Sequence, residues 1–189
     1  MAVGLGTSNI SVVIPSLGKR KEELEKVLEH LRSLGFEDII VVNEKQMLGR
    51  YLATYRAKNE VIYTQDDDLI VENIPQLIEK YDEDKVVCNA KIGRVFWYNQ
   101  LCEGKIALVG YGAIFNRKLV HNMNRYLEKH PDDSMFEREA DRIFTFLNDK
   151  ELVIADEFIK DFPSSMDGIS NKSGHYESLY KVLDNLLHL

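Results

Sequence analysis

Three consecutive aspartates, Asp66, Asp67 and Asp68, follow an apolar run in the segment YTQDDDLIVEN, residues 63–73. Because side chains alternate along a strand, Asp66 and Asp68 would point the same way if strand geometry continued through them. Two such carboxylates could hold Mg²⁺ or Mn²⁺, which prefer oxygen ligands and often bind one or two carboxylates together with substrate phosphates. The alternative is a charged turn before a helix, where acidic residues are favourable without any ligand.

Other residues that could carry chemistry are spread along the chain. Asn43 follows an apolar run, and its amide suits the mixed donor and acceptor edge of a uracil, although a turn residue that bonds its own backbone fits equally. Arg50 and Arg56 carry guanidinium groups that suit phosphate oxygens, but six residues apart they do not share a helix face. Asp141 lies in an amphipathic stretch and is a candidate general base. A salt bridge to Arg138 is its structural alternative.

The elements that must position these residues alternate in type. Apolar, β-branched runs predict buried strands at 10–18, 37–44 and 60–68, and periodic stretches predict helices at 21–35, 48–57 and 73–81, the last with Asn73 as its N-cap. This alternation predicts parallel strands joined by right-handed crossovers. Ligands of open α/β sheets bind beyond the carboxyl ends of the strands. The segments PSLG, NEKQ and DDD should therefore line one crevice.

The second half of the chain is less regular. Strands are expected at 85–90, 93–99 and 152–159, helices at 135–149 and 177–189, and a strand, a turn, a short strand and a helix start within 106–120. The chain has 189 residues, 44% of them apolar and 29% charged, which predicts one globular domain after a flexible segment, 1–9. The net charge of −7 gives no broad basic field for nucleic acid.

The location of the protein is predicted from what the sequence lacks. No apolar run is long enough to cross a bilayer, and the N-terminus lacks the pattern of a secretory signal. The two cysteines have no metal-ligand spacing and suit a reducing compartment. We therefore expect a cytoplasmic protein without a membrane span.

The order of these segments resembles the nucleotide-sugar glycosyltransferases of the GT-A fold. The similar segments are SVVIPSLGKRKEELEKVLEHL, IIVVNE, VIYTQDDDLIVE, GYGAIF, EADRIFTFL and GISNKSGHYES, the last of which resembles exostosin-type transferases. The resemblance covers residues 10 to about 180. It implies an α/β, Rossmann-like GT-A fold with a mostly parallel central sheet flanked by helices, and a smaller mixed second sheet. It also divides the domain, 10–189, into a nucleotide-binding half, 10–90, and an acceptor-binding half, 91–189.

The resemblance implies a metal-dependent transferase that moves a hexosyl or N-acetylhexosaminyl group from a nucleoside diphosphate sugar, a UDP-sugar by preference, to an acceptor hydroxyl. Asp68 would be the direct ligand of Mn²⁺ or Mg²⁺, with Asp66 and His175 as further ligands. The catalytic base would be Asp141 or its neighbour Glu139, because the family pattern has adjacent acids and Ala140 separates them here. The donor would be held by Pro15, Ser16, Asn43, Arg50, Asp66, Asp67 and Lys172.

The acceptor and the reaction class leave alternatives. The acceptor would be a glycan, a lipid-linked sugar, a protein or a modified nucleobase. A metal-dependent nucleotidyltransferase also uses paired acids, but PSLGKRKEE has one glycine and matches a glycine-rich phosphate loop weakly. A non-enzymatic acidic, metal-binding interaction module of response-regulator type would leave the C-terminal half unexplained.

Overall fold

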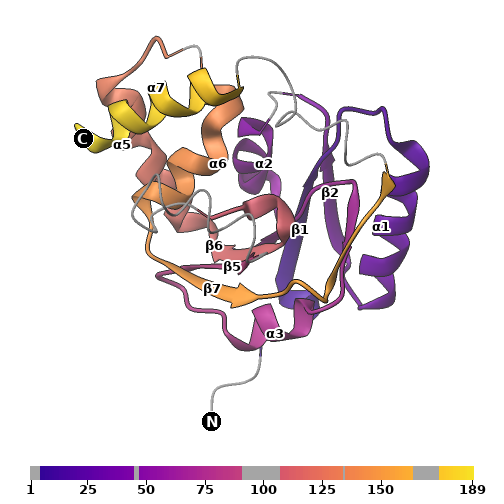
Figure 1. The fold of residues 1–189 in the computed structure, drawn as a ribbon. Coiled ribbons are helices and arrows are strands. Elements are labelled where there is room, and N and C mark those ends of the chain that lie inside the picture. Colours follow the sequence, from indigo (N-terminus) through magenta and orange to yellow (C-terminus); the bar gives the residue numbers. More distant parts are fainter. Residues whose placement is uncertain (1–4, 45–46, 91–106, 134, 164–174) are drawn as a thin grey trace.

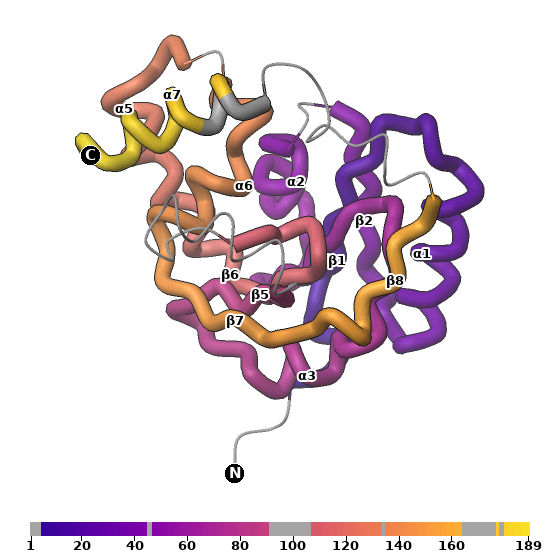
Figure 2. Tube along the Cα trace, viewed as in Figure 1, coloured from indigo at the N-terminus to yellow at the C-terminus, as the bar shows by residue number. Residues whose placement is uncertain are grey.

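The computed structural model of the chain describes residues 5–44, 47–90, 107–133, 135–163 and 175–189. Six described strands form the main sheet in the order β2-β1-β3-β6-β5-β7, and two more pair as a small sheet, β4-β8. The main-sheet strands are β1 (Ile10–Pro15), β2 (Asp38–Val42), β3 (Val61–Thr64), β5 (Val86–Ala90), β6 (Ala113–Asn116) and β7 (Lys150–Ile154). The small sheet joins β4 (Leu69–Val71) to β8 (Ile159–Asp161), as Figure 2 shows.

The direction of the strands confirms a mostly parallel central sheet. The neighbours β1–β2, β1–β3 and β5–β7 are parallel, whereas β6 runs antiparallel to both β3 and β5. The small sheet is antiparallel. Among the parallel pairs, β1–β2 joins consecutive strands through α1, as a strand–helix–strand unit requires, whereas β1–β3 and β5–β7 pair strands that are not consecutive in the chain.

Helices cover both faces of the main sheet (Figure 1). They are α1 (Lys21–Ser33), α2 (Leu48–Ala53), α3 (Ile74–Glu79), α5 (Asn124–Lys129), α6 (Phe136–Leu147) and α7 (His175–Leu187), with short 3₁₀ turns at Thr7–Asn9, Thr54–Arg56, Val109–Tyr111 and Arg117–Met123. Three elements of the structure were not expected from the sequence, namely α5 and the two strands of the small sheet, β4 and β8. The expected strand at 93–99 lies outside the described residues.

The core consists of two apolar clusters, one on each face of the sheet. Val12 and Ile14 of β1 pack in the cluster that α1 and α3 cover, whereas Val13 packs in the cluster under α2, α6 and α7. Successive residues of a strand point to opposite faces, so a strand buried on both sides reads as an unbroken apolar run. This explains why the runs at 10–15 and 86–90 lack polar alternation.

One local expectation was wrong, and another is confirmed only in position. The expected strand at 60–68 ends at Thr64 and resumes as β4 at Leu69, so Asp66, Asp67 and Asp68 lie in the connection. Aspartate is a poor strand former, and the backbone N–H of Asp66 bonds the carbonyl of Gly110 instead of continuing a regular ladder. Asn73 does lie at the N-cap position of α3, as expected, but its side chain makes no capping bond, because its amide pairs with the amide of buried Asn89.

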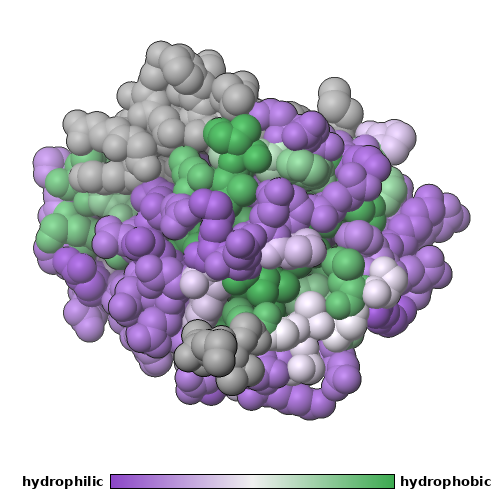
Figure 3. Space-filling model, turned by 90° about the horizontal axis from the view of Figure 1, so that it is seen from below, coloured by the Kyte–Doolittle hydropathy of each residue, from purple (hydrophilic) through white to green (hydrophobic). Residues whose placement is uncertain are grey.

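The surface is largely polar on the face seen from below, where smaller apolar areas lie between polar side chains (Figure 3). Among the described helices, none combines the length and the apolar character that a membrane crossing requires. Both observations agree with the composition of the chain.

Candidate functional site

The loops that follow β1, β2 and β3 meet at the carboxyl ends of these parallel strands. Pro15 pairs with Val42 at the end of β2, and the backbone N–H of Ser16 donates to the Val42 carbonyl over 2.7 Å. Val13 of β1 pairs with Thr64, the last residue of β3. The predicted donor residues Pro15 and Ser16 therefore lie at the same end of the sheet as the aspartates, with exposed Asn43 just beyond β2.

The three aspartates have different partners. Nη1 of Arg20, the residue before α1, lies 3.2 Å from Oδ1 of Asp67 and 2.6 Å from Oδ2 of Asp68. Asp66 instead pairs with Arg50, whose Nη2 lies 2.5 Å from Oδ1 of Asp66. Two guanidinium groups thus offset three carboxylates, which leaves a net negative charge at this end of the sheet.

The environment of Asp68 disfavours its ionised form. It is only 8% exposed, and burial together with neighbouring Asp66 raises its pKa to about 6 despite the opposing effect of Arg20. A carboxylate with a raised pKa gains when another cation approaches.

These residues fit a divalent cation that takes few protein ligands. Within the described residues, no group of three His, Cys, Asp or Glu side chains is arranged as a complete metal site. Asp66, whose side chain is 38% exposed, and Asp68 supply oxygen atoms of the kind that Mg²⁺ and Mn²⁺ bind, and substrate phosphates commonly complete such sites. Asp66 and Asp68 are therefore the candidate ligands among the described residues.

Arg50 links the aspartates after β3 to Asp141, one of the two predicted catalytic acids. It lies on α2 with a side chain that is 0% exposed, and its Nε is 3.3 Å from Oδ1 of Asp141 on α6. Burial opposes its charge, but Asp141 and Asp66 outweigh that effect and raise the pKa of Arg50. Arg50 is thus a buried link between Asp66 and Asp141, and the nucleotide contact that the resemblance implies for it stays a prediction.

Asp141 is held from α2 by two side chains. Besides Arg50, the hydroxyl of Tyr51 donates to Oδ1 of Asp141 over 2.8 Å. Both contacts use Oδ1, which leaves Oδ2 for a substrate. Burial raises the pKa of Asp141, and Arg50 partly offsets this. A rigidly held carboxylate with a raised pKa has the properties of a general base.

The two candidate acids on α6, Glu139 and Asp141, have different surroundings. Glu139 is fully buried and accepts a hydrogen bond from Arg142 on the next turn, with Arg138 also close to it. Asp141 alone shares partners with the aspartate cluster. The alternative pairing of Asp141 with Arg138 is wrong, since Nε of Arg138 lies 3.6 Å from Oε1 of Glu139 and Asp141 contacts Arg50 and Tyr51 instead.

Three residues of the site were not singled out from the sequence. Arg20 belongs to the basic pair in PSLGKRKEE, and Tyr51 is the neighbour of Arg50. At Gly110, in the segment GYGAIF, an added Cβ would lie 2.2 Å from Oδ2 of Asp66. Only a glycine lets the backbone approach that carboxylate so closely.

Two predicted site residues cannot be placed. His175 is the first residue of α7, but its side chain lies outside the described part of the structure, as does Lys172. Their roles as metal ligand and donor contact stay predictions.

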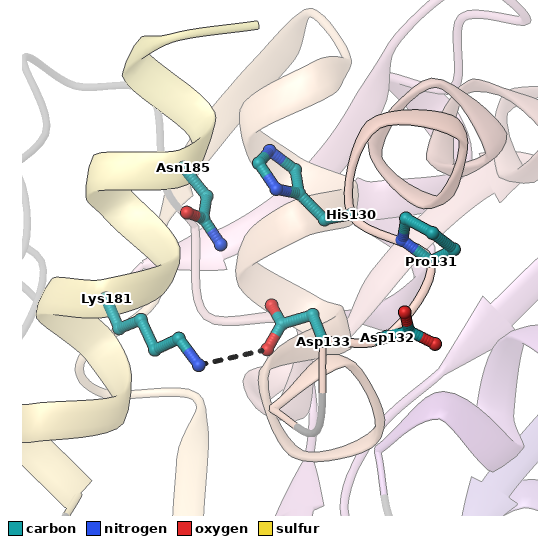
Figure 4. Close-up of a pocket in the computed structure, with 6 residues that line it drawn as sticks. All are labelled: His130, Pro131, Asp132, Asp133, Lys181 and Asn185. Carbon is teal, nitrogen blue, oxygen red and sulfur yellow. Dashed lines mark ion pairs between the residues drawn. The ribbon is translucent and has the colours of Figure 1, made fainter.

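A cavity elsewhere does not involve the predicted site. It measures about 290 Å³ and lies between α7 and the segment that follows α5 (Figure 4). Six residues line it: His130, Pro131, Asp132, Asp133, Lys181 and Asn185. Lys181 and Asp133 face each other across it at 3.9 Å, and neither belongs to the aspartate cluster.

Comparisons with known proteins address the fold. No protein-family model matches the chain, and no curated protein matches its sequence. Among solved structures, the catalytic domain of Drosophila β1,4-galactosyltransferase 7, solved with xylobiose, has a TM-score of 0.54 and 17% identity over 91% of this chain and 79% of that one. A glycosyltransferase involved in glycosylation of the major capsid of PBCV-1 has a TM-score of 0.46 and 11% identity over 77% and 81%. The first likeness and the sheet topology together show that the chain has the GT-A-like α/β fold.

Proposed function

We propose that this protein is a metal-dependent glycosyltransferase that moves a sugar from a nucleoside diphosphate sugar, a UDP-sugar by preference, to an acceptor hydroxyl. One observation carries the proposal: a single buried arginine, Arg50, ties the aspartates after β3 to Asp141 on α6. The reaction needs a cation-binding group for the departing diphosphate and a base for the incoming hydroxyl. Arg50 fixes candidates for both in one network.

Donor binding is assigned to the carboxyl ends of β1, β2 and β3. Ser16 and Asn43 would face the nucleoside, and Asp66 with Asp68 would hold Mn²⁺ or Mg²⁺ against the diphosphate. The bound cation would supply charge neutralisation for the leaving group. The ion pair between Arg20 and Asp68 must break when that cation binds, because Nη1 of Arg20 already lies 2.6 Å from Oδ2 of Asp68. Its guanidinium is then suited to a phosphate oxygen.

Acceptor activation is assigned to Asp141. Oδ2 would take the proton of the acceptor hydroxyl, while Tyr51 and Arg50 hold Oδ1 in place. Arg50 also stabilises the carboxylate before the transfer and loses part of that interaction when Asp141 becomes neutral. The acceptor is a hydroxyl-bearing glycan, lipid-linked sugar, protein or modified nucleobase, and the transferred group a hexosyl or N-acetylhexosaminyl unit.

The test is calorimetric titration of UDP into the protein with Mn²⁺ or with EDTA. Wild type should bind UDP more tightly with Mn²⁺, and Asp68→Asn should lose that difference. Asp184→Asn is the matched control, because Asp184 lies exposed on α7 at a distance from the sheet ends. Equal UDP affinity in Asp68→Asn and wild type with Mn²⁺ would refute the metal assignment. A panel of nucleotide sugars then identifies the donor by its hydrolysis.

A further inference from the structure

The connection between β3 and β4 begins with a buried amide side chain, that of Gln65. Gln65 is 0% exposed and directly precedes the three aspartates. Its Nε2 donates to the carbonyl of Leu69 over 2.9 Å and to the carbonyl of Asp66 over 3.4 Å. The side chain therefore bonds the backbone on both sides of Asp67 and Asp68.

The orientation of this amide is set by Tyr63, the last residue but one of β3. The hydroxyl of Tyr63 donates to Oε1 of Gln65 over 2.9 Å, and both side chains are fully buried. The ring of Tyr63 stacks on Phe36 with centroids 5.9 Å apart, which holds the hydroxyl in place. Because carbonyl oxygens only accept, the amide must present Nε2 to the backbone and Oε1 to the hydroxyl.

Backbone hydrogen bonds hold the same connection at two further points. The N–H of Asp66 donates to the carbonyl of Gly110 over 2.9 Å, and the N–H of Phe162 donates to the carbonyl of Asp68 over 2.8 Å. These bonds tie the connection to segments distant in the sequence, whereas Gln65 joins its two ends to each other. A buried carbonyl that loses its donor is unfavourable, so loss of the amide should let the connection change shape.

The shape of the connection matters because Asp66 and Asp68 are the candidate ligands of one cation. Mg²⁺ requires near-ideal octahedral geometry with short bonds, so a small displacement of either carboxylate weakens its binding. We propose that Gln65 is a positioning residue for the cation site: its amide closes the connection into one fixed shape, and Tyr63 orients that amide. The inference rests on the proposed function and adds two residues that act through the aspartates.

Gln65→Met tests this role, because it removes the donor and keeps the length of the side chain. Calorimetric affinity for Mn²⁺ with UDP present should fall by about 10–100-fold, the usual loss when a group that orients a metal ligand is removed. Backbone amide exchange of residues 66–71, measured without metal, should become faster in the same variant. Tyr63→Phe keeps the ring and should produce both effects more weakly.

The control is Asn148, a buried amide with the same pattern of hydrogen bonds near the C-terminal end of α6. Its Nδ2 donates to the carbonyls of Phe144 and Leu119 over 2.8 and 3.4 Å, and its Oδ1 accepts from Asn122 over 2.6 Å. Asn148→Leu should lower the urea midpoint, as Gln65→Met does, since each loses a buried amide. It should leave Mn²⁺ affinity with UDP within about twofold of wild type, because it lies away from the aspartates.

The outcomes separate positioning from general stability. Unchanged Mn²⁺ affinity in folded Gln65→Met, an equal loss in Asn148→Leu, or unchanged amide exchange at 66–71 would each overturn the role. In the Asp68→Asn background, Gln65→Met should cause little further loss of Mn²⁺ affinity, and a full additional loss would show that Gln65 acts elsewhere. If Gln65→Met does not fold, the same two measurements on Tyr63→Phe decide the question.

Failure of the proposed function has a different signature. Wild type that binds no Mn²⁺ in the presence of UDP would refute the metal-dependent transfer and, with it, the assignment of Gln65 to a cation site. The exchange rates of residues 66–71 would still decide whether Gln65 holds the connection in shape.

Discussion

Replacement of Arg50 by methionine should destabilise the protein far more than the loss of a surface arginine. Methionine has a similar length and fills the apolar part of the space, but it removes the charge that faces Asp66 and Asp141. Removal of one partner from a buried ion pair costs about 3–5 kcal/mol, because the other charge stays buried. Water can reach Asp66, which is 38% exposed, so most of the cost arises at Asp141. We expect a loss of about 3–4 kcal/mol in the free energy of unfolding.

The pH dependence of this loss follows from the pKa of Asp141. Burial already raises that pKa and Arg50 lowers it, so removing Arg50 raises it further. The penalty for an ionised Asp141 is present above its pKa in the variant. It disappears as the pH falls and the carboxyl group protonates. Arg50→Met should therefore lose more stability at pH 8 than at pH 5.

Urea denaturation followed by circular dichroism measures the effect. Arg50→Met/Asp141→Asn should recover much of the loss, because the uncompensated carboxylate is gone. Arg32→Met is the control: Arg32 pairs with Glu25 on the surface and its loss should cost less than about 1 kcal/mol. A cost below about 1 kcal/mol for Arg50→Met, or no recovery in the double variant, would refute the idea that Arg50 neutralises Asp141.

Three further changes test the neighbouring residues. Asp141→Asn should lower sugar transfer by ~10²–10⁴-fold and leave UDP affinity within about twofold, whereas transfer at the wild-type rate would end its role as base. Asp68→Asn should raise the free energy of unfolding by about 1–3 kcal/mol at pH 7.5 without metal, because the pKa of Asp68 in the folded protein, about 6, lies above its value in the unfolded chain. This gain in stability should vanish below about pH 4. A melting temperature that falls at pH 7.5 would contradict the prediction. Arg20→Gln should tighten Mn²⁺ binding measured calorimetrically without nucleotide, because Mn²⁺ no longer displaces an ion pair; weaker or unchanged binding would show that Arg20 and the cation do not compete.

The prediction for Asp68 also gives an internal check on the proposed function. The Asp68→Asn protein should be more stable than wild type at neutral pH and yet lose the Mn²⁺-dependent part of UDP affinity. A variant that merely misfolds cannot show both effects. Stability given up at a functional site in this way is common, because the electrostatic strain that binds a ligand is unfavourable without it.

Much of the fold was predictable because it depends on local patterns. The apolar runs that became β1 and β5 are buried on both faces, whereas the run that became β2, also expected to be buried, is only partly buried at the edge of the sheet. The periodic stretches that became α1 and α6 each present an apolar side to the sheet. Strand and helix alternation then required the parallel pairs β1–β2 and β1–β3, which bring Ser16 and the aspartates to one end of the sheet. Short-range order along the chain was sufficient for these features.

The tertiary structure decided what depends on partners distant in the sequence. Nothing in the sequence around the three aspartates indicates that Arg20 forms ion pairs with Asp67 and Asp68 and that Arg50 pairs with Asp66. The burial of Arg50 and its link to Asp141 arise where α2 packs against α6, 90 residues apart at Tyr51 and Asp141. The choice between Glu139 and Asp141 has the same origin. The two acids point to different sides of one helix, and only the packing of that helix determines which side meets the end of the sheet.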